Sequence, residues 1–269
     1  MVYPGRPFED YLVETLLGRG GEAAVYRARG IDPAHPVVAL KVLDDAHRDS
    51  GCTGRLAREF RLARRLSHPH IVEVYDHGPF WMAMQYVDGG NVTSLPTLDD
   101  RLAALRQIAA ALDHAHRDGI VHNDVKPTNI LVHQNFSRDG AVLIDFGVAY
   151  VLAEDVWHRP SRPMASLPYA APELLQGRLP QAATDEYGLA CTALEVLTGR
   201  TPFAGENPLA LVDAHLHLPP PEVSRQFPWL SRMFDVVLAR AIAKDPDRRY
   251  ESCTEMMRRI EDAVRRTGQ

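Results

Sequence analysis

The sequence changes character near Asp88–Gly89–Gly90, and this change limits the fold more than any other feature. Before it, residues 11–43 and 71–88 contain short runs rich in Val, Tyr, Ile and Met, bounded by Gly, Pro and Asp, which is typical of strands. Between these ranges, residues 55–66 repeat apolar side chains at helical spacing. Those positions are Leu56, Phe60, Ala63 and Leu66. The first third of the chain therefore predicts a small β-rich lobe with one main helix.

After this boundary the pattern is mainly helical. An apolar face recurs from Leu102 to Leu112, and Gly119 is expected to end that helix. Short β runs cover 130–132 and 142–144, and residues 148–170 contain three prolines without periodicity, which predicts a long loop. Further helical patterns cover residues 185–198, 208–216, 230–243 and 251–265. We therefore predict an α+β, bilobal fold in one domain at residues 8–266, with lobes at about 8–88 and 91–266 and a cleft between them.

Composition excludes several classes of protein. The chain has 269 residues, 45% hydrophobic and 24% charged, which suits a globular domain with a sizeable core. A net charge of -5 predicts no nucleic-acid partner, and no apolar run approaches the roughly 18 residues of a membrane helix. Three cysteines without C-x-x-C spacing predict scattered reduced thiols rather than disulfides or a metal site. We expect a cytoplasmic protein with no membrane segment.

The segment from His122 to Asn129 places a carboxylate, an ammonium and an amide at fixed offsets, at Asp124, Lys126 and Asn129. A second acid, Asp145, follows within Asp145–Phe146–Gly147. A single acid in such a segment is most often a turn residue. Turn formation does not explain the whole set, because several residue types would have to coincide in both spacing and order. Two acids and an amide can accept a hydroxyl proton and hold magnesium on nucleotide phosphates. The set therefore predicts phosphoryl transfer.

Two weaker features lie nearer the N-terminus. The glycine-rich stretch 18–25 follows a predicted strand, and glycines let backbone N–H groups approach phosphate oxygens. Taken alone it also suits an ordinary hairpin, and the absence of a following Gly-Lys-Ser/Thr excludes a Walker loop. Lys41 ends a predicted strand and Glu59 lies on the predicted helix, so either is by itself a common surface charge. Paired, they would direct an ammonium toward phosphates.

Taken together, these residues resemble the bacterial eukaryotic-like (Hanks-type) serine/threonine protein kinases over roughly residues 11–265. The resemblance extends to Ala171–Pro172–Glu173, to Arg249 as the expected partner of Glu173, and to Asp185 as the helix aspartate that bonds the catalytic loop. It implies a non-specific serine/threonine kinase that uses ATP with Mg²⁺, or Mn²⁺ as an alternative, and acts on serine and threonine hydroxyls of protein substrates. It also implies an ATP-binding cleft between the lobes.

The resemblance assigns the site residues. Asp124 would be the catalytic base, Lys126 would neutralise charge on the transferred group, and Lys41 with Glu59 would complete the catalytic set. Asn129 and Asp145 would be the metal ligands. The residues implied to contact ATP are Leu17, Gly18, Arg19, Gly20, Gly21, Glu22, Ala23, Ala24, Val25, Ala39, Lys41, Met84, Gln85, Val87, Asn91 and Leu131.

One departure from the family concerns regulation. Asn123 stands where these kinases usually have an arginine that pairs with a phosphate on the activation loop, and a neutral amide cannot form that charge-assisted pair. The loop from Asp145 to Glu173 contains no threonine and offers Ser161 and Ser166, of which Ser166 is expected to be structural. We therefore hypothesise a non-RD kinase whose activity does not require activation-loop phosphorylation. Regulation by a protein acting in trans remains an expectation.

Two alternatives remain at this stage. Small-molecule phosphotransferases of the aminoglycoside or choline kinase type also carry H-x-D with a small or polar middle residue, as in His122–Asn123–Asp124. Lys126, Phe146–Gly147 and Arg249 favour a protein kinase instead. A non-catalytic pseudokinase scaffold is the third reading, although nothing requires it, because Lys41 and the three active-site polar residues are all present.

Overall fold

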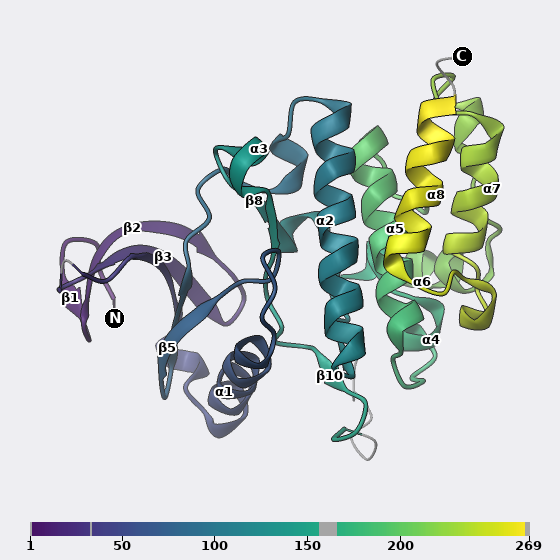
Figure 1. Cartoon of the computed structure of the whole chain (residues 1–269). Coiled ribbons are helices and arrows are strands. Elements are labelled where there is room, and N and C mark those ends of the chain that lie inside the picture. Colours follow the sequence, from purple (N-terminus) through teal and green to yellow (C-terminus); the bar gives the residue numbers. More distant parts are fainter. Residues whose placement is uncertain (1, 33, 156–165, 267–269) are drawn as a thin grey trace.

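A computed structural model describes residues 2–32, 34–155 and 166–266, and it divides into a sheet and a helical body (Figure 1). The sheet is antiparallel, with the order β1-β2-β3-β4-β6-β5. Its strands are β1 (Pro7–Phe8), β2 (Tyr11–Arg19), β3 (Ala23–Gly30), β4 (Val37–Leu43), β5 (Val74–Gly78) and β6 (Trp81–Gln85). This β-rich part with one main helix and the helical part beyond it confirm the predicted α+β, bilobal fold.

The main helix of the sheet region, α1 (Ser50–Arg65), begins five residues before the predicted range. Asp49 caps its first turn, because its Oδ1 accepts hydrogen bonds from the backbone N–H of Gly51 at 2.8 Å and of Cys52 at 3.0 Å. Gly51 and Gly54 have low helix propensity, so the sequence pattern did not predict a helix over the first five residues of α1. The buried face of α1 includes Glu59, an acid among apolar side chains. The sheet region therefore presents a carboxylate to its own core.

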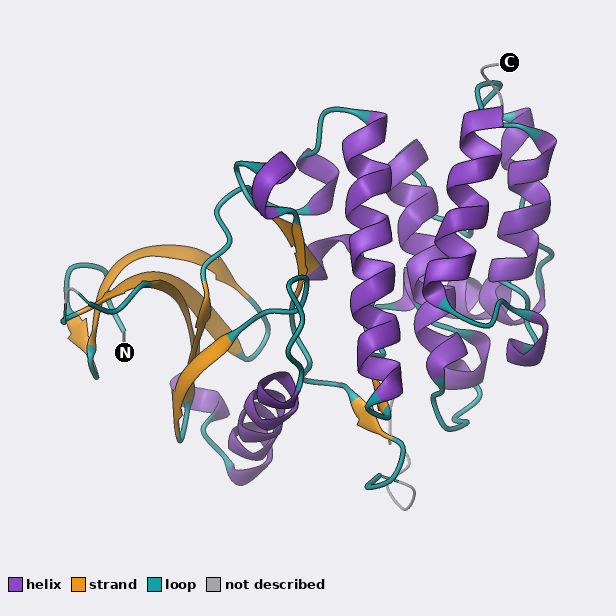
Figure 2. Cartoon of the chain, viewed as in Figure 1, coloured by secondary structure: helices purple, strands orange, loops and turns teal. Residues whose placement is uncertain are grey.

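The helical body contains most of the helices (Figure 2). Its helices are α2 (Leu98–Arg117), α3 (Phe136–Asp139), α4 (Pro172–Leu175), α5 (Ala182–Thr198), α6 (Pro208–His217), α7 (Arg232–Ala241) and α8 (Cys253–Arg265). Helix α2 packs against α5 and α8, and Gly119, with φ +72°, follows its end as predicted. The described part of the chain contains no helix long and apolar enough to cross a membrane.

Four short strands form two pairs outside the six-stranded sheet. Strand β8 (Ile130–Val132) pairs with β9 (Ala141–Leu143), and β7 (Ile120–Val121) pairs with β10 (Tyr150–Val151). The range 148–170, predicted as a loop, therefore contains a strand and also a 3₁₀ turn at Leu167–Tyr169. Residues 156–165, including the predicted loop positions His158, Arg159, Ser161 and Arg162, lie outside the described residues. These strand pairs flank the polar segments on which the functional prediction depends.

One buried apolar cluster runs from the sheet through the helical body, and a smaller one covers the far face of the sheet. Strand β4 shows how the sequence divides between them. Its odd positions Ala39 and Leu43 belong to the large cluster, whereas Val38 and Leu40 belong to the small one. Because strand side chains alternate between faces, Lys41 is turned toward the same side as Ala39 and Leu43. This places an ammonium between the two halves of the molecule.

Candidate active site

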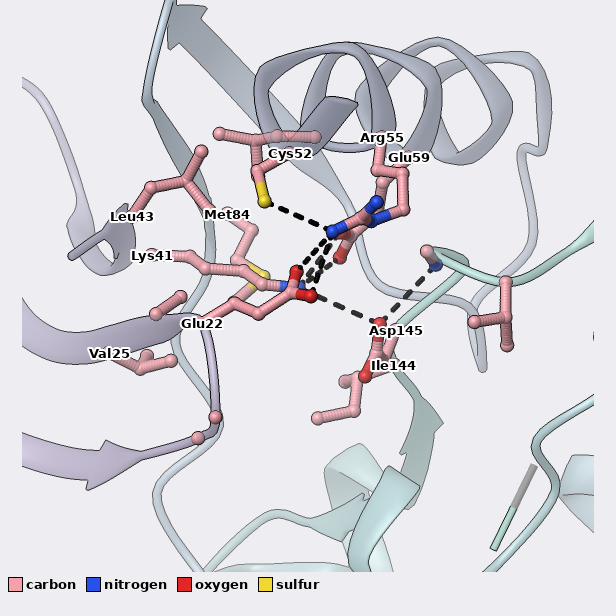
Figure 3. Close-up of a pocket in the computed structure, with 16 residues that line it drawn as sticks. Glu22, Val25, Lys41, Leu43, Cys52, Arg55, Glu59, Met84, Ile144 and Asp145 are labelled. Atoms are coloured by element: carbon pink, nitrogen blue, oxygen red, sulfur yellow. Dashed lines mark hydrogen bonds and ion pairs between the residues drawn. The ribbon is translucent and has the colours of Figure 1, made fainter. Parts of the chain in front are cut away.

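Lys41 and Glu59 form a buried ion pair between β4 and α1 (Figure 3). Lys41 Nζ donates to both carboxylate oxygens of Glu59 at 2.8 Å and lies 3.6 Å from Oδ1 of Asp145. Burial alone would lower the pKa of Lys41, but the Glu59 and Asp145 carboxylates outweigh it and raise that pKa above its ordinary value. The ammonium is therefore charged throughout the physiological range and joins residues from three separate segments.

Asp145 follows β9 and points toward Lys41 (Figure 3). Its backbone has φ +69°, and its Oδ1 accepts from the backbone N–H of Gly147 at 3.3 Å. Burial would raise the pKa of Asp145, but the nearby Lys41 ammonium outweighs that effect and the pKa is lowered. Phe146 is buried against the ring of His122, with ring centroids 4.8 Å apart. Asp145 therefore presents an ionised carboxylate, the form in which it can bind a cation.

The catalytic-loop segment brings its predicted residues together. Asp124 Oδ2 accepts from Lys126 Nζ at 2.6 Å and from Asn129 Nδ2 at 3.0 Å. Asp124 Oδ1 faces the backbone N–H of Ser166 at 3.3 Å, and Lys126 also donates to the Ser166 hydroxyl at 3.0 Å. Because the Nδ2 of Asn129 donates to Asp124, its Oδ1 is left as an acceptor. A carboxylate, an amide oxygen and an ammonium therefore converge here.

Asp185 of α5 binds the backbone of this segment. Asp185 is 1% exposed and accepts from the backbone N–H groups of His122 and Asn123, both at 2.7 Å. His116 of α2 lies 2.8 Å from the same carboxylate. The sequence pattern did not single out His116, because one histidine on a helix carries no signal of its partner. The contacts of Asp185 agree with those that the family resemblance implied.

Asn123 adopts φ +67°, in the left-handed region that asparagine tolerates better than most residues. Its Nδ2 donates to the backbone carbonyl of Val148 at 3.2 Å. Within the described part of the chain, its buried Oδ1 has no hydrogen-bond partner. The residue at the position of the family arginine therefore binds backbone of the segment that follows Asp145.

A second buried ion pair joins Glu173 of α4 to Arg249. Arg249 donates to Glu173 through two parallel bonds, at 2.7 Å and 2.8 Å, and both side chains are almost fully buried. Thr184 adds a hydrogen bond to the same carboxylate at 2.9 Å. Such bidentate pairs are strong and directional. Arg249 is thus the partner of Glu173 in the structure, as the resemblance implied.

The glycine-rich turn connects β2 and β3 and covers a cavity beside Lys41 (Figure 3). A side chain at Gly18 or Gly21 would meet no atom within 4 Å, so the space next to this backbone is open. Glu22 at the turn pairs with Arg55 of α1, with both of its oxygens 2.8 Å from Nη2. Arg19 lies 3.5 Å from Asp44. Both predicted ATP-contacting side chains therefore already have charged partners, whereas the turn backbone faces open space.

The cavity gathers only part of the predicted nucleotide set. The predicted residues that line it are Gly20, Gly21, Glu22, Ala23, Val25, Lys41, Glu59, Met84 and Asp145. Gly147 of the Asp145–Phe146–Gly147 motif also lines it, and the lining residues that the sequence reasoning missed are Leu43, Cys52, Arg55, Leu56, Ile144 and Val148. Most of these are apolar residues whose pattern indicated core packing and nothing more. Arg55 and Cys52 are close to each other, with Nη2 of Arg55 3.1 Å from Sγ.

The remaining predicted nucleotide contacts lie around the strands and the chain that joins the two halves. Their positions are Leu17, Gly18, Arg19, Ala24, Ala39, Gln85, Val87, Asn91 and Leu131, none of which lines this cavity. Ala39 and Met84 face each other across β4 and β6, and Asn91 bridges to Leu131. Asn91 Oδ1 is occupied by Thr93, whose backbone N–H donates at 2.9 Å. The contacts of these nine residues with a nucleotide therefore stay a prediction.

Comparison with known proteins gives concordant results. A protein-family model described as "Protein kinase domain" matches residues 11–259. Serine/threonine-protein kinase PknJ of Mycobacterium tuberculosis is 40% identical over 93% of the chain and 45% of PknJ, and PknF of the same species is 36% identical over 95% and 56%. The crystal structure of the M. tuberculosis PknI kinase domain has a TM-score of 0.72 at 32% identity and covers 98% of this chain and 100% of that one. The chain spans about half the length of the curated relatives it matches.

Proposed function

The chain belongs to the protein kinase family, as a bacterial serine/threonine kinase domain, and from this premise we propose that it transfers the γ-phosphoryl group of Mg-ATP to serine and threonine hydroxyls of proteins. The observation that carries the proposal is the convergence of Asp124, Lys126 and Asn129 in one hydrogen-bonded group. The buried Lys41–Glu59 pair and the Asp145 carboxylate are the second half of the site. We take the domain to extend over residues 8–266.

Each residue would contribute a distinct step. Asp124 would accept the proton of the substrate hydroxyl, and Lys126, 2.6 Å from that carboxylate, would neutralise charge on the phosphoryl group. Lys41, held by Glu59, would bind phosphate oxygens together with backbone N–H groups of the glycine-rich turn. Residues such as Ala39, Met84 and Leu131 would enclose the adenine by apolar contact.

The site also fits a divalent cation. Asp145 has a lowered pKa and Asn129 presents its amide Oδ1 as an acceptor, and Mg²⁺ prefers carboxylate, amide and phosphate oxygens. When bound, such an ion supplies charge neutralisation across the phosphates of ATP. We propose Asn129 and Asp145 as the residues that hold it, with Mn²⁺ as an alternative metal.

A transfer assay tests the proposal directly. The chain would be incubated with labelled ATP, Mg²⁺ and casein, beside Asp124→Asn, which keeps the shape of the side chain but removes the base. We expect label on serine and threonine and at least a hundredfold lower rate in the variant. Transfer only to aminoglycosides or choline would support the small-molecule reading. Nucleotide binding without transfer would support a scaffold.

We also propose that this kinase is of the non-RD type and is active without a phosphate on its activation loop. Asn123 is neutral and its Nδ2 is bonded to the Val148 carbonyl, so it offers no cation to a phosphate. Treatment with a phosphatase, or Ser161→Ala outside the described residues, is expected to change the rate less than threefold. A loss of a hundredfold or more in either experiment contradicts the idea.

A further inference from the structure

Arg58 precedes Glu59 on α1 but points toward a different part of the molecule. Neighbouring helix positions project about 100° apart, so Glu59 faces Lys41 while Arg58 faces the segment that follows Asp145–Phe146–Gly147. Arg58 Nη1 donates to Asp155 Oδ1 at 2.9 Å, and its Nη2 contacts Asp155 Oδ2. The same Nη2 donates to the carbonyl of Ala149 at 3.2 Å. One arginine thus binds this segment at two points.

Asp155 is itself held in place by hydrogen bonds to the backbone of Val151. Its Oδ2 also accepts from the backbone N–H of Val151 at 2.8 Å, and its own N–H donates to the Val151 carbonyl at 2.9 Å. Its side chain is 10% exposed and that of Arg58 is 29% exposed. A partly buried, bidentate arginine–carboxylate pair is much stronger than a pair in water, and loss of one partner leaves a charge in a desolvated place.

The segment held by this pair is attached to the catalytic loop. Val151 belongs to β10, which pairs with β7, and β7 leads directly into His122–Asn123–Asp124. Asn123 makes a second connection through the Val148 carbonyl. A continuous set of contacts therefore runs from Arg58 of α1 through Asp155 and β10 to β7, the strand that precedes Asp124. Figure 1 shows α1 and β10, the two elements that it joins.

We propose that Arg58 and Asp155 are positioning residues that hold α1 in the orientation in which Glu59 meets Lys41. The inference rests on the proposed kinase function and concerns its regulation. Kinases with an arginine at the position of Asn123 order this region through a phosphate. Here an unmodified carboxylate, Asp155, performs the ordering, so the active arrangement is present without modification.

The chain supplies a matched control between the same two elements. Arg65 of α1 lies 3.0 Å from Glu154, and their side chains are 46% and 58% exposed. Exposed pairs of this kind contribute little, because water and salt screen them and both side chains lose entropy. If any contact between α1 and this segment were sufficient, loss of either pair would have the same effect on activity. The proposal predicts that only loss of the Arg58–Asp155 pair lowers activity.

The test compares Asp155→Asn with Glu154→Gln in the full chain after phosphatase treatment. For Asp155→Asn we expect a kcat at least tenfold lower, a KM for ATP within threefold and faster amide hydrogen exchange in residues 50–65. For Glu154→Gln we expect kcat and KM within twofold of the unchanged chain. The proposal is overturned if the kcat of Asp155→Asn stays within twofold of that of the unchanged chain. It is also overturned if the fall in kcat is accounted for entirely by a smaller fraction of folded protein, measured in a thermal unfolding scan.

Two further variants keep the test decisive. Arg58→Lys retains the charge but loses the bidentate geometry, and we expect it to lower kcat by three- to tenfold even where Asp155→Asn fails to fold. The double variant Arg58→Glu with Asp155→Arg should exceed either single reversal at least fivefold in kcat. Equal activity of the double and single variants contradicts a direct pair. If the unchanged chain transfers no phosphate at all, the kinase proposal fails instead, a result separate from any difference between variants.

Discussion

Helices α5 and α1 support the two halves of the site in different ways. Thirteen of the seventeen residues of α5 are buried, and its Asp185 holds the catalytic-loop backbone from inside the helical body. Only five of the sixteen residues of α1 are buried, and it reaches the rest of the site through ion pairs at Glu59 and Arg58. The catalytic loop is therefore held by a helix buried in the core, whereas the orientation of the Lys41 ammonium depends on a less buried helix that uses charged contacts as well as an apolar face.

This difference indicates where stability and activity separate. Changes beneath the catalytic loop should reduce the free energy of unfolding, because they disturb groups with no access to water. We expect changes around α1 to reduce catalysis first, because a smaller share of its residues is buried than in α5.

The largest expected effect is on the α5 side. Arg249→Met leaves the Glu173 carboxylate buried without its cation, and we expect the free energy of unfolding to fall by about 3–5 kcal/mol. Urea denaturation followed by circular dichroism measures it. The combined variant Arg249→Met with Glu173→Leu should recover much of the loss, because the uncompensated charge is then absent. A fall of less than about 1 kcal/mol for Arg249→Met would remove the contrast with α1.

The next effect is on the α1 side and should appear in activity. Glu59→Gln removes the charge that holds the Lys41 ammonium, and we expect kcat to fall about a hundredfold, roughly 2.7 kcal/mol of transition-state stabilisation. The free energy of unfolding should fall by less than it does for Arg249→Met, because the Asp145 carboxylate remains near the Lys41 ammonium as a second partner. Steady-state kinetics beside a urea titration decides this. Equal losses in both measurements would show that α1 is as essential to folding as α5.

The smallest effect is a pH dependence that belongs to α5. Burial raises the pKa of Glu186 to about 8, so the folded protein keeps a proton that the unfolded chain releases near its ordinary pKa. Folding then binds a proton between these values, and the free energy of unfolding should decrease as pH rises from about 4.5 to 8 and level off above that. Urea titrations of the original chain and Glu186→Gln at pH 5, 7 and 9 test the sign. We expect Glu186→Gln to lose this decrease in the free energy of unfolding between pH 5 and 9. An original chain whose free energy of unfolding rises over this range relative to the variant contradicts the prediction.

Much of the architecture was predictable because it follows local patterns. Periodic apolar positions identified the main helices to within a few residues, and glycine at the end of α2 identified its stop. The start of α1 was missed, since Gly51 and Gly54 weaken the helical pattern of its first five residues, although Asp49 caps that end of the helix. Strand β10 was missed because a two-residue strand carries no periodicity and exists only through its pairing with β7.

The candidate site shows the same division. The residue types and their order in His122–Asn129 and Asp145–Gly147 pointed to phosphoryl transfer, because few other reactions need that set. The side of the cavity formed by Cys52, Arg55 and Leu56 was not predicted. On a helix, an arginine that lines a cavity and an arginine in water have the same sequence signature.

The sequence by itself determined the fold class and the chemistry, since apolar periodicity and short polar motifs act over a few residues. The tertiary structure decided which charges meet. Arg58 and Asp155 are 97 positions apart, and Asn123 and Asp185 are 62 positions apart. An ion pair or hydrogen bond needs approach to about 3 Å, and only the packing of α1, β10 and α5 brings these groups that close. The absence of a cation at Asn123 was visible in the sequence because the motif around it is local. The role that we propose for the Asp155 carboxylate was not predictable, because it depends on a contact with the distant Arg58.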